Sequence, residues 1–299
     1  MSEQSVRTIE TEFLRIAYLE DGPADGWPVI LSHGFPYDVH AFENVALILA
    51  KKGARVVRPY LRGFGLTRFL SDDIMRNGQQ AARALDVVQL ANALQLERPI
   101  VGGFDWGGNA SCVAAALWPE QIGGLVSYAG YDVVDIEQQR HALAPSLERV
   151  CWYQHLFQTE RGRACLSERR NELCRILWRE WSPGWEFDIT TYERSAASFD
   201  NPDFVDVVIH CYRWMFGLAS GDSGLQALED RLMHRPKIVV PTVTIDGTAD
   251  PLKPGGTADH AFLFVGAHEH RTVTAGHNLP QEVPGTFAEA VLKVRTWQK

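Results

Sequence analysis

The sequence predicts an α/β fold in which a mostly parallel sheet is flanked by helices and interrupted by an inserted helical domain. Short apolar strand-like runs alternate with helical runs over the first 130 residues, which is typical of parallel strands joined by helical crossovers. From 131 to 235 the sequence contains almost only helical segments, and strand signals return after 236. We therefore expect a core domain of residues 1–130 and 236–299 and a helical domain of residues 131–235.

Composition and charge narrow the class of protein. The chain has 299 residues, and 29 Lys and Arg against 37 Asp and Glu give a formal net charge of −8. Nucleic acids and anionic membranes select basic faces, so neither is expected as the main partner. No stretch approaches the roughly 18 uninterrupted apolar residues of a membrane span. We expect a cytoplasmic globular enzyme or binding protein, because residues 1–12 also lack the apolar segment of a secretory signal.

The five cysteines are widely spaced and contain no C-x-x-C pair. Neither a disulfide framework nor a metal site is therefore expected.

The core elements follow from hydrophobic spacing. In chain order we expect a strand at 28–32, a helix at 41–52, a strand at 55–59, a helix at 79–95, a strand at 99–104, a helix at 107–118 and a strand at 124–128. Gly53 ends the first helix, because glycine readily adopts the left-handed conformation that follows a helix. In the second helix one apolar face is predicted to be buried, made by Ala82, Leu85, Val88 and Ala91.

The insertion and the end of the chain complete the pattern. The clearest helices of the insertion are expected at 147–158, 168–181 and 204–216, and five of the nine tryptophans lie within 131–235. These tryptophans indicate an aromatic core or a lined pocket. Strands are expected at 237–245 and 270–274, and a final helix at 286–297.

The strongest local signal is Gly103-Phe104-Asp105-Trp106-Gly107-Gly108, where an apolar strand meets a helix of small residues. Glycines two before and two after Asp105 permit a sharp turn that lifts one side chain above the sheet. Alone, the motif also fits a glycine-rich turn whose aspartate caps the helix. Its context therefore has to decide between these interpretations.

Three further segments provide that context. His33-Gly34-Phe35-Pro36 follows an early strand, where backbone N–H groups can bind an oxyanion. Asp250 follows the strand at 237–245 and His277 follows the last strand, so a nucleophile, an acid and a base occur in that order. Asp132 and Asp246 remain alternative acids.

These motifs resemble those of α/β-hydrolases of the epoxide hydrolase and haloalkane dehalogenase branch, over nearly the whole chain. The segment 33–36 is similar to the H-G-x-P motif of that branch, Gly63-Phe64-Gly65-Leu66-Thr67 to its G-x-small-x-Ser/Thr motif, and 103–108 to its nucleophile motif. The resemblance implies an α/β-hydrolase fold with residues 131–235 as the cap domain. It also implies backbone N–H groups of Phe35 and Trp106 as the oxyanion hole, and substrate contacts from His33, Phe35 and Trp106.

An aspartate at the nucleophile position determines the reaction class. Ester or amide cleavage would require an acid anhydride, whereas a carboxylate is suited to in-line attack on an sp³ carbon, which gives an alkyl ester. His277 would then activate water to hydrolyse that ester, and Asp250 would orient His277. This chemistry needs no cofactor and no metal.

The leaving atom distinguishes an epoxide from a halide. An opening epoxide requires a proton donor, and Tyr153 and Tyr212 lie in segments that resemble those around the two cap tyrosines of epoxide hydrolases. Phe35 stands where many haloalkane dehalogenases have a halide-binding Asn, and Trp106 and Asn109 stand where fluoroacetate dehalogenases have Arg. We expect an epoxide hydrolase acting on a small apolar molecule, with a homodimer possible. A haloalkane dehalogenase and a non-catalytic ligand-binding protein are the alternatives.

Overall fold

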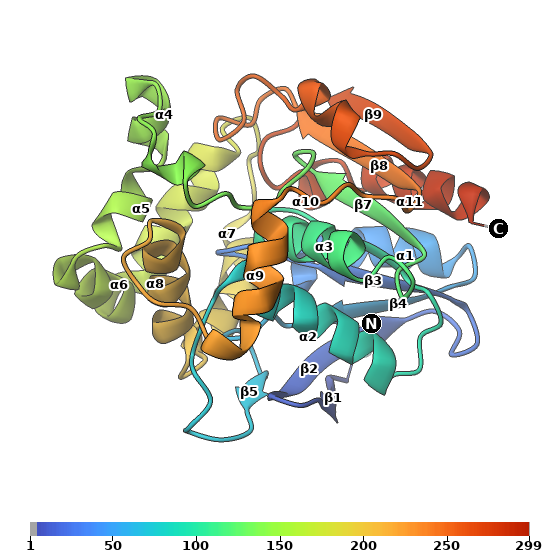
Figure 1. Ribbon diagram of the computed structural model, residues 1–299, viewed down its shortest axis with the longest axis horizontal. Helices are drawn as coiled ribbons and strands as arrows, with labels where there is room; N and C mark the ends of the chain where they lie inside the picture. The colour runs from blue at the N-terminus through green and yellow to red at the C-terminus, as the bar shows by residue number, and fades with distance from the viewer. Residues whose placement is uncertain (1–4, 299) are drawn as a thin grey trace.

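The computed structural model describes residues 5–298, which form one mixed nine-stranded sheet flanked by helices (Figure 1). The strand order is β1-β2-β4-β3-β6-β7-β8-β9, and β5 pairs with β2. The strands are β1 Arg7–Glu10, β2 Leu14–Asp21, β3 Trp27–Ser32, β4 Ala54–Pro59, β5 Arg68–Phe69, β6 Ile100–Gly103, β7 Gly124–Tyr128, β8 Thr242–Gly247 and β9 His268–Val273. From β4 to β9 all neighbours are parallel, and the pairings of β2 are antiparallel.

Helices cover both faces of this sheet. The helices are α1 Glu43–Ala50, α2 Gln80–Ala93, α3 Trp106–Leu117, α4 Pro145–Val150, α5 Trp152–Leu156, α6 Glu160–Trp181, α7 Ile189–Ala196, α8 Phe204–Met215, α9 Gln226–Met233, α10 Leu279–Glu282 and α11 Pro284–Trp297. Helices α1 and α11 pack together on one face, and α2, α3 and α9 pack together on the other. The predicted α/β class with a mostly parallel sheet is confirmed.

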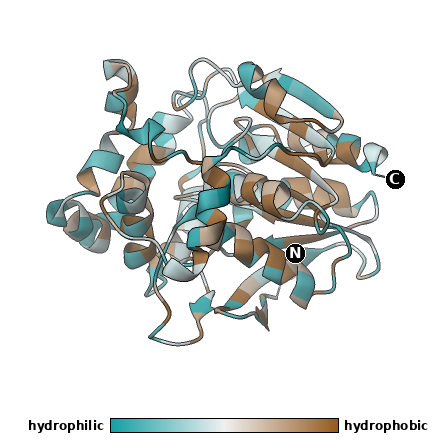
Figure 2. Ribbon diagram, viewed as in Figure 1, coloured by the Kyte–Doolittle hydropathy of each residue, from teal (hydrophilic) through white to brown (hydrophobic). Residues whose placement is uncertain are grey.

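The apolar runs of the strands are explained by this two-sided cover. In β3, Val29 and Leu31 join the hydrophobic cluster on the α1 and α11 side, and Ile30 joins the cluster on the α2 and α3 side. Successive strand residues point to opposite faces, so a strand buried on both faces is apolar throughout. Figure 2 shows brown strands in the interior, while β9 at the sheet edge is largely hydrophilic.

The segment between β7 and β8 is helical, as predicted, and α4 to α8 gather at one end of the sheet in Figure 1. Helix α9 differs from the others, because it packs on α2 and α3 and its Glu229 accepts hydrogen bonds from Gln79 and Gln80. The division into domains at 131 and 235 remains a prediction.

Several element boundaries differ from the predicted ones. The helix expected at 147–158 is divided at Cys151 into α4 and α5, and α6 begins eight residues earlier than 168 because Thr159 caps it by accepting from the Gly162 N–H. Strand β8 begins at Thr242 instead of 237, because Pro241 lacks an N–H group and Ile238 makes only an isolated bridge. The hairpin β1–β2 has no counterpart among the predicted elements.

Residues 5–298 contain no helix with both the length and the apolar composition needed to span a bilayer.

Candidate active site

The turn between β6 and α3 presents Asp105 above the sheet. Asp105 has φ 50° and ψ −128°, a conformation that non-glycine residues seldom adopt. A Cβ atom on Gly103 would lie 2.3 Å from the backbone carbon of Gly107, and one on Gly107 would lie 1.9 Å from the carbonyl oxygen of Ser32. Both flanking positions therefore require glycine, as the motif predicts.

The carboxylate of Asp105 has two differently placed oxygens. Its Oδ1 accepts a hydrogen bond of 2.7 Å from the backbone N–H of Phe35. Its Oδ2 lies 3.5 Å from Nε2 of His277. One oxygen is thus held by the loop that follows β3, and the other faces the histidine.

Loops at the carboxyl ends of parallel strands bring these groups together. Ser32 at the end of β3 pairs with Gly103 at the end of β6, and β7, β8 and β9 continue the sheet in the same direction. Segments that follow these strands meet at one edge of the sheet, which is where open α/β sheets form their sites.

Of the three candidate acids, Asp250 is the one that contacts His277. Its Oδ2 lies 2.8 Å from Nδ1 of His277, and the Tyr128 hydroxyl lies 3.0 Å from the same oxygen. Asp246 instead accepts hydrogen bonds from the backbone and side chain of Thr257. Asp132 lies in the wall of the neighbouring cavity.

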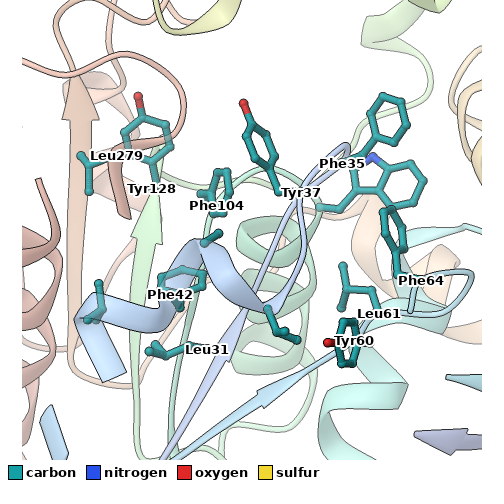
Figure 3. Close-up of a cluster of buried hydrophobic side chains, with 14 of the residues drawn as sticks. Leu31, Phe35, Tyr37, Phe42, Tyr60, Leu61, Phe64, Phe104, Tyr128 and Leu279 are labelled. Carbon is teal, nitrogen blue, oxygen red and sulfur yellow. The ribbon is translucent and has the colours of Figure 1, made fainter. Parts of the chain in front are cut away.

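An aromatic layer supports the site from below. Figure 3 shows Tyr37, Phe104 and Tyr128 in one row above Phe42, with the hydroxyls of Tyr37 and Tyr128 on the same side. The ring of Phe104 lies 6.0 Å from the His277 ring and 5.0 Å from the ring of Tyr37. This packing limits the positions that the imidazole can take.

The charge of His277 is set by its two carboxylate neighbours. Burial lowers the pKa of His277, but Asp250 and Asp105 outweigh burial and raise this pKa to about 10. The imidazole is therefore protonated at neutral pH while both carboxylates are charged. Removal of either charge would lower this pKa.

The Asp105→Asn variant is expected to lower the pKa of His277, because an amide removes one of the two negative charges that raise it. Asp250→Asn should lower it further, since Asp250 has the larger influence. NMR titration of the imidazole against pH measures both shifts, and exposed His234 is the internal control. An unchanged pKa in the two variants would show that these carboxylates do not control His277.

His33 lies in the loop that follows β3, as predicted, with its ring turned into the protein. It is fully buried, Leu61 donates its backbone N–H to Nε2, and Nδ1 lies 2.9 Å from the Gly34 carbonyl oxygen. Burial lowers the pKa of His33 to about 4, so the ring is neutral. His33 is not among the residues that line the cavity, and its ring nitrogens join two loops; its contact with substrate stays a prediction.

Phe35 and Trp106 form an aromatic pair beside Asp105. Their rings stack with centroids 5.5 Å apart, and Trp106 lines the cavity while the fully buried Phe35 ring lies against it. Figure 3 shows Phe35 and Phe64 on the same side of the cluster. Phe35 therefore acts at the site through its backbone N–H, which donates to Asp105, and through the packing of its ring on Trp106.

Asp105, His277, Tyr153 and Tyr212 border one cavity of about 770 Å³. The two tyrosine rings are perpendicular with centroids 5.3 Å apart, and Gln154 donates a hydrogen bond to the Tyr153 hydroxyl. Burial raises the pKa of both phenols well above 10, and the charge of Asp105 adds to this effect. Both hydroxyls therefore remain protonated. Within residues 5–298, no group of three or more His, Cys, Asp or Glu is placed to bind a metal ion.

Two groups at the site were not predicted from the sequence. Trp181 is a fully buried core residue, and its ring also lies 5.2 Å from His277 and 5.0 Å from Tyr153. Arg83, in the first turn of α2, lines the cavity. No pattern in the sequence distinguishes Arg83 from a solvated helix residue.

The chain is similar to a known protein family and to solved structures. The profile of the alpha/beta hydrolase fold family matches residues 28–160. A crystal structure from Klebsiella pneumoniae, of a protein named as a candidate epoxide hydrolase, is 40% identical, covers 97% of both chains and gives a TM-score of 0.95. Epoxide hydrolase A from Mycobacterium thermoresistibile, 19% identical over 98% of both chains with a TM-score of 0.76, shares the fold.

Curated relatives match over shorter segments. A haloalkane dehalogenase from Mycobacterium marinum is 31% identical over 42% of this chain and 42% of its own length. Epoxide hydrolase B from Mycobacterium tuberculosis is 28% identical over 64% of this chain and 55% of its own length. The chain thus spans about half the length of the curated relatives it matches.

Proposed function

Because the chain belongs to the α/β-hydrolase fold family and is epoxide hydrolase-like in sequence and structure, we propose that it hydrolyses an epoxide to a vicinal diol. The observation that carries the proposal is that two buried tyrosine hydroxyls border the same cavity as the Asp105 carboxylate. A carboxylate can open the oxirane ring, and protonated phenols can stabilise the alkoxide that this opening creates.

In the first half-reaction, Oδ2 of Asp105 attacks an oxirane carbon and the C–O bond of the ring breaks. We assign the attack to Oδ2 because Oδ1 is held by the Phe35 N–H, 2.7 Å away. The epoxide oxygen leaves as an alkoxide and takes up a proton from Tyr153 or Tyr212. The phenolate left behind regains a proton when His277, whose pKa falls once Asp105 is esterified, releases its own. The product is an ester between Asp105 and the substrate.

In the second half-reaction, His277, now neutral, accepts a proton from water, and the resulting hydroxide attacks the ester carbonyl carbon. The bond between that carbon and the substrate oxygen then breaks, and the departing alkoxide takes the proton of the new carboxyl group. The diol leaves, Asp105 is again a carboxylate, and His277 is again protonated. Esterification removes the charge of Asp105, which lowers the pKa of His277 and makes it a better base. Asp250, which lies 2.8 Å from Nδ1, stabilises the imidazolium that forms.

The ester carbonyl oxygen is Oδ1, so the oxyanion forms where the Phe35 N–H already points. One preorganised donor of this kind lowers the free energy of the transition state by about 3 kcal/mol. Trp106, the first residue of α3, supplies the second backbone N–H in this scheme.

The tyrosines provide the test that separates epoxide from halide chemistry. Each single Phe variant, Tyr153→Phe or Tyr212→Phe, should lose roughly 10- to 100-fold in epoxide turnover, because one donor remains. The double variant should lose much more, because the alkoxide would form without a donor. Steady-state diol release measures both effects.

Tyr192→Phe is the matched control, because this buried hydroxyl donates to the Asn171 carbonyl oxygen and does not line the cavity. Turnover by the double variant that equals the wild type would contradict the epoxide assignment. Haloalkanes assayed in parallel test the dehalogenase alternative, which is favoured by the curated relative from M. marinum and predicts halide release.

A further inference from the structure

Arg83 is a buried cation at the wall of the cavity. Its residue is 1% exposed, and its guanidinium lies 4.7 Å over the Trp106 ring. Nη2 donates to Oδ1 of Asn109 at 2.8 Å, and Nη1 donates to Sγ of Cys211 at 3.0 Å. The side chain thus reaches from α2 to the helix of the nucleophile and to the helix that carries Tyr212.

Arg83 has more N–H donors than there are hydrogen-bond acceptors around it. A guanidinium has five N–H groups and keeps its charge in proteins, and a thiol is a weak acceptor. Within residues 5–298 the hydrogen bonds of Arg83 go to Asn109 and Cys211 and none goes to a carboxylate, and its Nε has no hydrogen-bond partner. Buried charges are normally paired, so Arg83 requires a further oxygen acceptor.

Asp132 lies in the same cavity wall and has a carboxylate to which no group donates among residues 5–298. Its backbone oxygen accepts 2.7 Å from Nδ2 of Asn109, which places it beside Arg83. Its side chain is half-buried, and among residues 5–298 its hydrogen bonds are made by its backbone and not by its carboxylate. Burial and the nearby charge of Asp105 raise the pKa of Asp132, while Lys253 and Arg83 oppose that shift.

The distance from the nucleophile limits where a ligand group can lie. Asn109 follows Asp105 by four residues in α3, and its backbone N–H donates to the Asp105 carbonyl oxygen at 2.9 Å. Four residues of helix correspond to a rise of about 6 Å. A substituent a few bonds from the oxirane carbon can therefore reach Arg83 and Asp132 while Asp105 attacks.

We propose that Arg83, Asn109 and Asp132 form a polar subsite that binds a hydroxyl or carboxamide substituent of the epoxide. Such a group accepts a hydrogen bond from Arg83 and donates one to Asp132. An alkyl substituent would leave the buried guanidinium and the half-buried carboxylate without these hydrogen bonds, and a carboxylate would meet the negative charges of Asp132 and Asp105. The inference rests on the proposed function, because it names the class of epoxide.

A matched set of epoxides tests this subsite. In 3,4-epoxybutan-1-ol a hydroxyl replaces the terminal methyl of 1,2-epoxypentane, and 3,4-epoxybutanamide and 3,4-epoxybutanoate provide the amide and the anion. The wild-type kcat/KM should be at least about tenfold higher for the alcohol and the amide than for epoxypentane, because a site that hydrogen-bonds a substituent rejects analogues lacking it. No preference, or a preference for the butanoate, would overturn the proposal.

The Arg83→Met variant should reduce the ratio of kcat/KM for alcohol over epoxypentane to near one, and Asp132→Leu should reduce it as well. Using a ratio within one preparation removes the effect of partly folded protein. Arg179→Met, which removes an exposed arginine of α6 outside the cavity, should keep the wild-type ratio. Wild-type ratios in both subsite variants would overturn the proposal.

A binding measurement separates this inference from the proposed function. Ligand-observed NMR with butanamide requires no turnover, and we expect binding to the wild type that Arg83→Met abolishes. That result supports the subsite even if no epoxide is hydrolysed, whereas equal signals from the two proteins would overturn it. Turnover of epoxides without the expected preference leaves the hydrolase assignment intact and removes the subsite.

Discussion

Replacing Asp105 by asparagine is expected to abolish steady-state turnover, with a loss of at least about 10⁴-fold. The amide is a poor nucleophile, and it keeps the size of the carboxylate at the strained turn where φ is 50°. Turnover should be measured on freshly prepared protein, because slow deamidation regenerates aspartate. Asp230→Asn makes the same change at an exposed position of α9 and should retain activity.

Activity like that of the wild type in fresh Asp105→Asn protein would exclude Asp105 as the nucleophile. A gradual recovery that parallels the mass change of deamidation would support it.

The second large effect is expected for His277→Gln, which should permit ester formation and block ester hydrolysis. His277 is needed as a base only in the second half-reaction, so steady-state turnover should fall by roughly 10⁴-fold or more. Intact-mass measurement after mixing with substrate should show one covalent adduct, located on the peptide that contains Asp105. Exposed His234 provides the matched control, as His234→Gln.

Normal turnover by His277→Gln would show that another group activates the water. Absence of an adduct with a substrate that the wild type consumes would contradict the order of the two half-reactions.

The fold could be predicted from the sequence because its strands are buried on both faces and its turns carry glycine. Strand β7 has the predicted bounds, Gly124–Tyr128, and β6 and α3 differ from theirs by one residue at each end. The hairpin β1–β2 could not be predicted in this way, because β1 is mostly exposed and carries no apolar alternation. Short edge strands are fixed by pairing with their neighbours, which no local pattern shows.

The grouping of Asp105, Asp250 and His277 could be anticipated because the carboxyl ends of parallel strands meet at one edge. Arg83 could not. One apolar face of α2 is predicted to be buried, but most residues of this helix are buried because α3, α9 and the segment that contains Cys211 cover it. When elements distant in the sequence bury a polar residue, the hydrophobic pattern of its own helix does not show it.

The different surroundings of the two Asp105 oxygens could not be predicted from the sequence. The motif identifies Asp105, but only the structure distinguishes Oδ1, bound by the Phe35 N–H, from Oδ2, which faces His277. This difference predicts which oxygen becomes the ester carbonyl.

The measurement that tests the central claim most directly is a single turnover in H₂¹⁸O with enzyme in excess over epoxide. If Asp105 forms an ester that water attacks at the carbonyl carbon, the ¹⁸O enters the Asp105 carboxylate. The diol from that turnover then carries one oxygen from the epoxide and one from Asp105, both unlabelled. Mass spectrometry should therefore find a heavier Asp105 peptide and an unlabelled diol, whereas ¹⁸O in the diol with an unlabelled peptide would show direct attack by water and contradict the account.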